Sequence, residues 1–302
     1  MKAKTIKSII RKKHEDWMES IDCEETRKLV KKNTIVTGGS IVSMLLGEKV
    51  NDFDIYFRDL DTVLAVTEYY VNKFNNLNPH VKTEEGVYVE PAYYKRDNDR
   101  VKVFIRSAGV AGESKPNYQY FESQEPGSTA ASDYVSEVIQ EIEDETKPKY
   151  RPIFLSSNAI TLSNKVQLVI RFYGEPEEIH KNYDFVHCTN YWDSATGDLV
   201  LHQKALESIL SKELRYVGSK YPLCSIIRTR KFIARGWTIN AGQYVKMAFQ
   251  LQEFDLNDPR VLEEQLTGVD IHYFFEVIEA LKKRDDKRVD TAYLMEVIDR
   301  IF

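Results

Sequence analysis

The first motif that could do chemistry is Gly38-Gly39-Ser40, which follows the short apolar segment at residues 34–37. Paired glycines let a backbone turn tightly and approach a ligand closely. A serine at the start of a helix adds a hydroxyl to the free amide N–H groups there, and both can bind phosphate oxygens. The pattern therefore predicts a phosphate-binding turn between a strand and the helix expected at residues 41–46.

The second motif is Asp52-Phe53-Asp54-Ile55, in which polar and apolar residues alternate as in a half-buried strand. Because successive side chains of a strand point to opposite faces, Asp52 and Asp54 are expected to share one face. Two carboxylates beside a phosphate-binding turn suit Mg²⁺ held by carboxylates and substrate phosphates together. Alone, each motif is typical of an ordinary turn or strand edge; their order within one short stretch favours a functional site.

The order of strand, Gly-Gly-Ser turn, helix and Asp-x-Asp strand resembles the nucleotidyltransferase superfamily of DNA polymerase beta, poly(A) polymerases and CCA-adding enzymes. The residues that match its motif position for position are Gly38, Gly39, Ser40, Asp52 and Asp54. The segments at residues 160–168 and 184–188 look like a branch with many phage-encoded members. The resemblance covers most of residues 33–235. It implies a mixed sheet with flanking helices, a two-metal reaction and a third carboxylate on a later strand.

Asp184 is our candidate for this third carboxylate, because it lies in the apolar segment at residues 183–188, which we predict to be a strand. An acid in such a strand is unfavourable unless it is paired or binds a metal. Asp193 and Asp198 are alternatives, although each lies in a turn-like context. The predicted catalytic residues, which are also the predicted metal ligands, are Asp52, Asp54 and Asp184.

Basic residues on the helix expected at residues 222–235 would complete a nucleotide site. Arg228, Lys231 and Arg235 are spaced i, i+3 and i+7, so they share one helix face. Superfamily members similarly use basic residues on the helix after the catalytic domain, so Arg228 and Lys231 are predicted to bind the triphosphate. A solvated basic stripe explains the same spacing equally well. The predicted nucleotide-binding residues are Gly38, Gly39, Ser40, Arg228 and Lys231.

The resemblance implies that the chain transfers a nucleoside monophosphate from an NTP to an acceptor, with Mg²⁺ or Mn²⁺ as cofactor. RNA, such as a tRNA 3′ end, is the favoured acceptor, because a basic face suits a polyanion. One alternative is AMP transfer to a protein or small molecule, as in toxin–antitoxin and antibiotic-modifying relatives of this superfamily. The other is a non-catalytic module that binds a nucleotide or a protein.

The net charge of the chain hides an uneven distribution. The 302 residues carry a formal net charge of −5, but residues 116–146 contain eight acidic residues and no Lys or Arg. Without those eight acids the charge becomes +3, so an acidic chain does not exclude a nucleic-acid partner. Pro and Gly residues punctuate this stretch, and we expect an inserted loop or lid at about residues 107–150.

The remaining pattern predicts an α+β fold followed by an all-helical C-terminal region. Composition and periodicity predict a helical segment at residues 5–32, strands at residues 86–94, 101–105 and 165–172, and C-terminal helices that include residues 271–283 and 290–301. We expect a catalytic domain at residues 1–200, with an N-terminal helix, and a helical domain at residues 201–302. No apolar run reaches the ~18 residues of a membrane helix, and three scattered cysteines match no disulfide or zinc pattern. These features favour a cytoplasmic protein (in the host cytoplasm, if phage-encoded) without a membrane partner, and leave its oligomeric state open.

Overall fold

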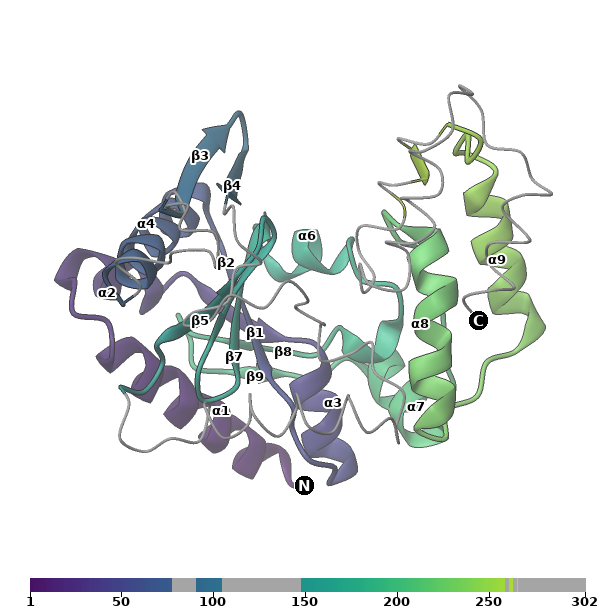
Figure 1. The fold of residues 1–302 in the computed structure, drawn as a ribbon. Helices are drawn as coiled ribbons and strands as arrows, with labels where there is room; N and C mark the ends of the chain where they lie inside the picture. The colour runs from purple at the N-terminus through teal and green to yellow at the C-terminus, as the bar shows by residue number, and fades with distance from the viewer. Residues whose placement is uncertain (78–90, 105–147, 259–260, 263–264, 266–302) are drawn as a thin grey trace, which may run out of the picture. The chain divides into compact units, whose positions relative to one another are not determined.

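A computed structural model describes residues 1–77, 91–104, 148–258, 261–262 and 265 (Figure 1). Their contacts divide the chain into two units. The first unit contains the described residues up to 180 together with residues 187–209. The second contains residues 181–186 and the described residues from 210 onward. None of the described helices is both long and apolar enough to cross a membrane.

A mixed sheet forms the centre of the first unit. Within the described residues it has seven strands, in the order β5-β6-β7-β2-β1-β8-β9. Neighbouring strands are antiparallel except for β2 and β7, which run parallel. The strands are β1 (Thr34–Thr37), β2 (Phe53–Phe57), β5 (Pro152–Leu155), β6 (Ala159–Leu162), β7 (Val166–Tyr173), β8 (Tyr191–Asp193) and β9 (Leu199–Val200). This arrangement confirms the predicted α+β fold with a mixed sheet and flanking helices.

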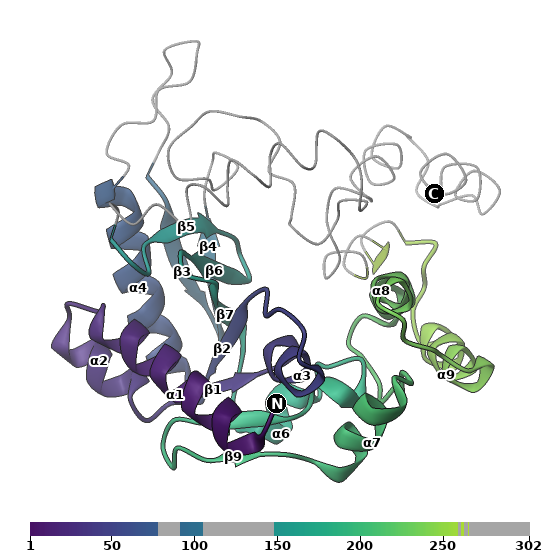
Figure 2. The ribbon, with the colours of Figure 1, turned by 90° about the horizontal axis from the view of Figure 1, so that it is seen from below.

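Three helices lie along one face of this sheet: α1 (Ala3–Glu19), α2 (Glu24–Val30) and α4 (Leu60–Leu77) (Figures 1 and 2). The sequence predicted a single helical segment at residues 5–32, and the structure instead has two helices there. Helix α4 starts where the carboxylate of Asp59 accepts a hydrogen bond from the Thr62 amide at 2.7 Å. Such a side-chain cap satisfies one of the free amides at a helix start.

The core lies between these helices and one face of the sheet. Along β7, Val166, Leu168 and Ile170 are fully buried, whereas Gln167 and Arg171 on the other face are half-buried. Strand β6 shows the same alternation. The inward residues of these strands join one cluster with buried residues of the helices, among them Ile6, Ile10, Trp17, Val63, Val66 and Tyr70. The core face is apolar, whereas the other face is mixed: it carries Gln167 and Arg171 together with Val169 of β7 and the buried Ile35 of β1.

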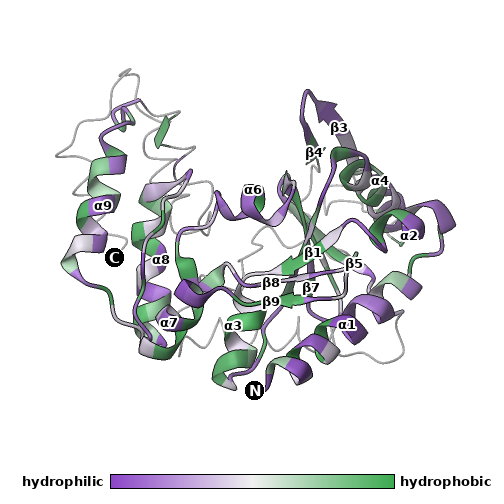
Figure 3. Ribbon diagram, turned by 180° about the vertical axis from the view of Figure 1, so that it is seen from behind, coloured by the Kyte–Doolittle hydropathy of each residue, from purple (hydrophilic) through white to green (hydrophobic). Residues whose placement is uncertain are grey.

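A separate two-stranded hairpin also belongs to the first unit. It consists of β3 (Tyr93–Asp97) and β4 (Arg100–Phe104), and β3 is markedly hydrophilic (Figure 3). Val101 and Val103 of β4 are buried in the core cluster. The strand predicted at residues 101–105 is confirmed, whereas much of the one predicted at residues 86–94 lies outside the described residues. The acidic insert predicted at about residues 107–150 also lies almost wholly outside them.

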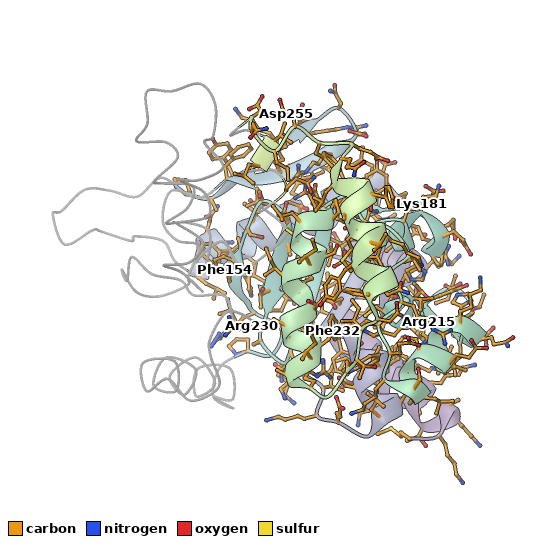
Figure 4. All side chains as sticks on the ribbon, turned by 90° about the vertical axis from the view of Figure 1, so that its right-hand side faces the viewer. Phe154, Lys181, Arg215, Arg230, Phe232 and Asp255 are labelled. Carbon is orange, nitrogen blue, oxygen red and sulfur yellow. The ribbon has the colours of Figure 1, made fainter. Side chains whose placement is uncertain are left out.

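The described part of the C-terminal region is helical, as predicted. It contains α7 (Gln203–Ser211), α8 (Pro222–Ala234) and α9 (Ala241–Leu251). Helices α8 and α9 pack side by side, and Phe232 of α8 contacts the rings of Phe185 and Trp237 (Figure 4). Helices predicted at residues 271–283 and 290–301 lie outside the described residues.

The strand predicted at residues 183–188 is wrong. These residues form a turn, a single bridge between Phe185 and Tyr216, and a short 3-10 helix, Val186–Cys188. The Val186 amide donates to the carbonyl of Arg215, and the Val217 amide donates to the carbonyl of Asp184. Because residues 184 and 186 hydrogen-bond to residues 215–217, this part of the segment does not join the central sheet.

Candidate nucleotide and metal site

The turn after β1 has the conformation that the Gly-Gly pair predicts. Gly38 has φ 93° and ψ −148°, a region that residues with a side chain rarely adopt. Its amide donates to the carbonyl of Cys188 at 3.2 Å. Helix α3 (Gly39–Leu46) begins directly afterwards. Gly38 is thus the N-cap, and Ser40, predicted at or near that position, is the second residue of the helix.

The start of α3 has both room and donors for an anion. A Cβ atom built on Gly39 would meet no other atom within 4 Å, so packing in the described chain does not explain the absence of a side chain there. Ser40 is only 2% exposed, and its Oγ has no hydrogen-bond partner among the described residues. The first amides of a helix also lack intrahelical partners and carry partial positive charge.

Sheet register brings the two motifs together. Strands β1 and β2 are antiparallel, and Thr37, the last residue of β1, pairs with Asp54 near the start of β2. The turn that follows β1 therefore lies at the same end of the strand pair as Asp52 and Asp54. Both carboxylates are half-buried, and the Phe53 between them is buried in the core. Asp54 thus lies on the face opposite the apolar core, and Asp52 directly precedes β2 at the same end of the strand.

Two residues flank Asp54 on that face: Thr37 of β1 and Gln167 of β7. The Thr37 hydroxyl lies 2.9 Å from the carbonyl of Asn190 and 2.9 Å from His180 Nε2. A hydroxyl has one hydrogen, so it donates to a carbonyl and accepts from the imidazole N–H. Burial, and secondarily the charge of His202, lowers the pKa of His180 to about 4. His180 is therefore neutral at physiological pH.

Gln167 was missed in the sequence. The available signal was the polar side chain at an outward position of the strand predicted at residues 165–172, but only the pairing with β2 shows that it lies beside Asp54.

The oxygen donors of this face fit a hard divalent cation such as Mg²⁺. Asp52 and Asp54 provide two carboxylates. The open Gly39 position and the Ser40 hydroxyl belong to the first two residues of α3, which follow the turn at Gly38. Within the described ranges, no three His, Cys, Asp or Glu side chains form a group that could hold a metal. Mg²⁺ commonly uses only one or two protein carboxylates and completes its coordination with water and substrate phosphates. Two carboxylates are therefore sufficient for a metal that is shared with a triphosphate.

Asp184 has charge partners within the second unit. Its carboxylate is 6% exposed, accepts a hydrogen bond from Ser219 Oγ at 2.9 Å, and lies 2.5 Å from Arg228 Nη1. These partners account for a buried acid without a metal ion. The role of Asp184 as third ligand stays a prediction. Of the two alternatives, Asp193 forms an ion pair with Arg58 and Asp198 with Lys7, each at 2.8 Å.

The basic residues of α8 occupy different environments. Arg228 forms the ion pair with Asp184, and Lys231 is half-buried. Arg230 is exposed, and its side chain points away from the α8–α9 pair (Figure 4). The predicted binding of triphosphate by Arg228 and Lys231 remains a prediction, and Arg228 would have to exchange or share its contact with Asp184 to fulfil it.

Comparisons with solved structures find distant similarity to tRNA-processing enzymes. The Thermotoga maritima CCA-adding enzyme complexed with tRNA is 10% identical and aligns over 95% of this chain and 53% of its own, with a TM-score of 0.39. The Bacillus stearothermophilus CCA-adding enzyme in complex with CTP is 13% identical over 87% of this chain and 51% of its own, also at 0.39. A tRNA-processing enzyme in an apo form is 12% identical over 95% and 56%, at 0.40. At these TM-scores the similarities carry no argument about function.

Comparison of the sequence with known families identifies the family of this chain. A protein of Bacillus phage SPbetaL7 named "Gabija anti-defense 2" is 23% identical over an alignment of 151 residues that covers 46% of this chain. The match spans only 38% of the length of that relative. Residues 8–212, which include both motifs and the whole central sheet, match the family described as "Gabija anti-defense 2 family protein". Since this match extends over more than half of the chain, the chain belongs to the Gabija anti-defense 2 family.

Proposed function

We propose that this protein is a Mg²⁺-dependent nucleotidyltransferase, which transfers a nucleoside monophosphate from an NTP to a nucleophile of an acceptor, releases pyrophosphate, and thereby acts against the Gabija defense. The observation that carries the proposal is the pairing of Thr37 with Asp54. It supports the proposal because it brings the Gly38–Ser40 turn and the two carboxylates to one end of two adjacent strands. The family description supports the proposed action against the Gabija defense, and the arrangement of the two motifs supports the proposed nucleotidyl transfer.

Each residue at this end of the sheet has a role in the proposal. Asp52 and Asp54 would hold Mg²⁺ or Mn²⁺. When bound, such ions lower the pKa of an attacking hydroxyl and stabilise negative charge on phosphate oxygens. The Ser40 hydroxyl and the first amides of α3 would hold the β- and γ-phosphates. Gly39 would let the backbone approach those phosphates without a side chain in between.

The proposed acceptor is RNA, and the β3–β4 hairpin supports this choice. Tyr93 and Phe104 pair across the hairpin with exposed rings that stack 5.1 Å apart. Lys95 and Lys102 pair next to them on the same face, where Lys102 forms an ion pair with Asp97 at 2.8 Å and Lys95 Nζ lies 5.5 Å from the Tyr93 ring centroid. Exposed aromatic rings beside a cation suit stacked bases and a phosphate backbone.

Two other functions have observations in their favour. AMP transfer to a protein or small molecule is favoured by the family name, because an anti-defense activity requires a target within the defense. A non-catalytic nucleotide- or protein-binding module is favoured by the finding that no three acids group into a metal site in the part of the chain that the structure describes. In each case the protein would work in the cytoplasm of the infected host.

A transfer assay with labelled nucleotides tests the proposal. The purified chain would be incubated with Mg²⁺ and each α-³²P-labelled NTP, together with total RNA and lysate of cells that carry the Gabija defense. We expect label in RNA, and no label with the Asp52→Asn/Asp54→Asn variant. Label only in protein bands or small molecules would replace the RNA acceptor with the second function. No transfer to any acceptor, despite anti-defense activity in cells, would overturn the proposed catalysis.

A further inference from the structure

The surroundings of Asp54 in the sheet define which side chains could share a ligand with it. Neighbouring strands lie about 4.8 Å apart, and residues paired in register project to the same face. The pairs of Asp54 are Thr37 on one side and Gln167 on the other. The next residue outward on that face is Thr161, which pairs with Gln167 and so lies two strands from Asp54.

These neighbours are not equally suited to bind a ligand. Thr37 is fully buried, and its hydroxyl is engaged by His180 and by the backbone carbonyl of Asn190. Gln167 is half-buried, and its side chain ends in an amide oxygen that can accept from a donor or coordinate a hard cation. Of the two residues in register with Asp54, Gln167 is the one with a side chain long enough to reach over the strand toward the acid pair.

We propose that the amide oxygen of Gln167 is the third protein ligand of the metal held by Asp52 and Asp54. This inference rests on the proposed function, because it requires a metal at that pair. It gives the site two carboxylates and one neutral oxygen, and hence a formal charge of −2 where three carboxylates would give −3. A less charged site binds free divalent metal more weakly and depends more on the triphosphate to deliver it.

The assignment also separates Gln167 from Asp184. Asp184 belongs to the second unit, where Arg228 and Ser219 already neutralise and orient its carboxylate. If Gln167 supplies the third oxygen, Asp184 is a structural residue of that unit. A carboxylate at position 167 would then create the three-acid site that the sequence resemblance led us to expect.

Titration of the full chain with Mn²⁺, followed by electron paramagnetic resonance, tests this assignment without an activity measurement. We expect Gln167→Glu to tighten Mn²⁺ binding about tenfold, and Gln167→Met, similar in size but without the oxygen, to weaken it about tenfold. Asp184→Asn should leave the affinity unchanged. Thr161→Glu is the matched control for added charge: it places an acid on the same face two strands away, and should change the affinity by less than Gln167→Glu does.

The outcomes distinguish this inference from the proposed function. Unchanged affinity in both Gln167 variants, with binding lost in Asp52→Asn/Asp54→Asn, would overturn the role of Gln167 and leave the metal site standing. Unchanged binding in Asp52→Asn/Asp54→Asn would remove both. A loss of affinity in Asp184→Asn alone would restore Asp184 as the third ligand. Circular dichroism of each variant checks folding, and the near-isosteric Gln167→Glu keeps the test decisive if Gln167→Met does not fold.

Discussion

The two faces of the central sheet show how one set of strands serves two purposes. Along β7, Leu168 and Ile170 are fully buried beneath helices, whereas Gln167 and Arg171 remain half-buried on the opposite face. Along β2, Ile55 is buried and Asp54 is half-buried. The backbone is shared, so the difference arises from side-chain alternation alone. On the face of Asp54, Tyr56 and Ile35 are also buried. We infer that the helix-covered face stabilises the unit and that the polar part of the other face, around Asp54 and Gln167, is suited to binding.

The largest effect is expected from the polar face. Asp52→Asn/Asp54→Asn keeps the size and shape of both side chains but removes the charges proposed to hold the metal. We expect nucleotidyl transfer to fall by about 10³-fold or more, while the free energy of unfolding changes by no more than about 1.5 kcal/mol. Initial transfer rates and urea unfolding of the same preparations measure both. A large loss of stability would show that these acids support the fold.

The matching change on the apolar face should have the opposite profile. Leu168 lies next to Gln167 in β7 and is fully buried in the core cluster. Leu168→Ala removes buried methyl groups and leaves a cavity, so we expect it to lower the free energy of unfolding by about 2–5 kcal/mol. Mn²⁺ affinity should be unchanged at temperatures where the variant is folded. Loss of metal binding in a folded Leu168→Ala protein would contradict the inference that one face of the sheet stabilises the unit and the other binds the metal.

A pH dependence of stability should arise on the helix-covered side, at His14 of α1. The Thr34 hydroxyl donates to the carbonyl of Val30 and so accepts from His14 Nε2, 2.7 Å away. Burial lowers the pKa of His14 from its usual value near 6.5 to about 4. Between these values the unfolded chain binds a proton that the folded chain does not, so stability is complete above pH 6.5 and falls toward pH 4.

The loss attributable to His14 should reach about 3 kcal/mol at pH 4. Urea unfolding at several pH values measures it, and His14→Gln should show a smaller decrease over that interval. His180 has a pKa lowered in the same direction, so a His180→Gln variant separates the two contributions. An equally steep dependence in His14→Gln would show that other groups cause it.

A smaller effect is expected at the turn that leads to the polar face. Because a Cβ on Gly39 would meet open space, Gly39→Ala should fold normally and gain up to about 1 kcal/mol from helix propensity. The added methyl would occupy space proposed for phosphate oxygens, so we expect NTP affinity to fall about tenfold. Equilibrium binding of an NTP with Mg²⁺ measures this. Unchanged affinity would place the phosphates elsewhere.

The sequence predicted much of the first unit because its signals are local. The Gly38-Gly39 pair and the alternation around Asp54 each depend on neighbouring residues, and the predicted turn, helix and strand are present. The environment of Asp184 could not be predicted from its neighbours in the sequence. Its apolar neighbours suggested a strand, but its charge partner, Arg228, lies 44 residues away in the chain.

Gln167 illustrates the same limit for the site. It lies more than a hundred residues from Asp54 in the chain, and only the parallel pairing of β2 with β7 brings the two side by side. Strand register depends on how the whole sheet assembles, and no sequence motif around position 167 predicts that Gln167 pairs with Asp54.

In the proposed function, the polar part of the sheet face beside the Gly38–Ser40 turn binds a metal and a triphosphate. A crystal structure of the full chain with Mn²⁺ and a non-hydrolysable NTP tests it most directly, because Mn²⁺ can be located by its anomalous scattering. We expect an anomalous peak coordinated by Asp52 and Asp54, with the β- and γ-phosphates at the first amides of α3. A nucleotide or metal bound elsewhere, with this face empty, would contradict it.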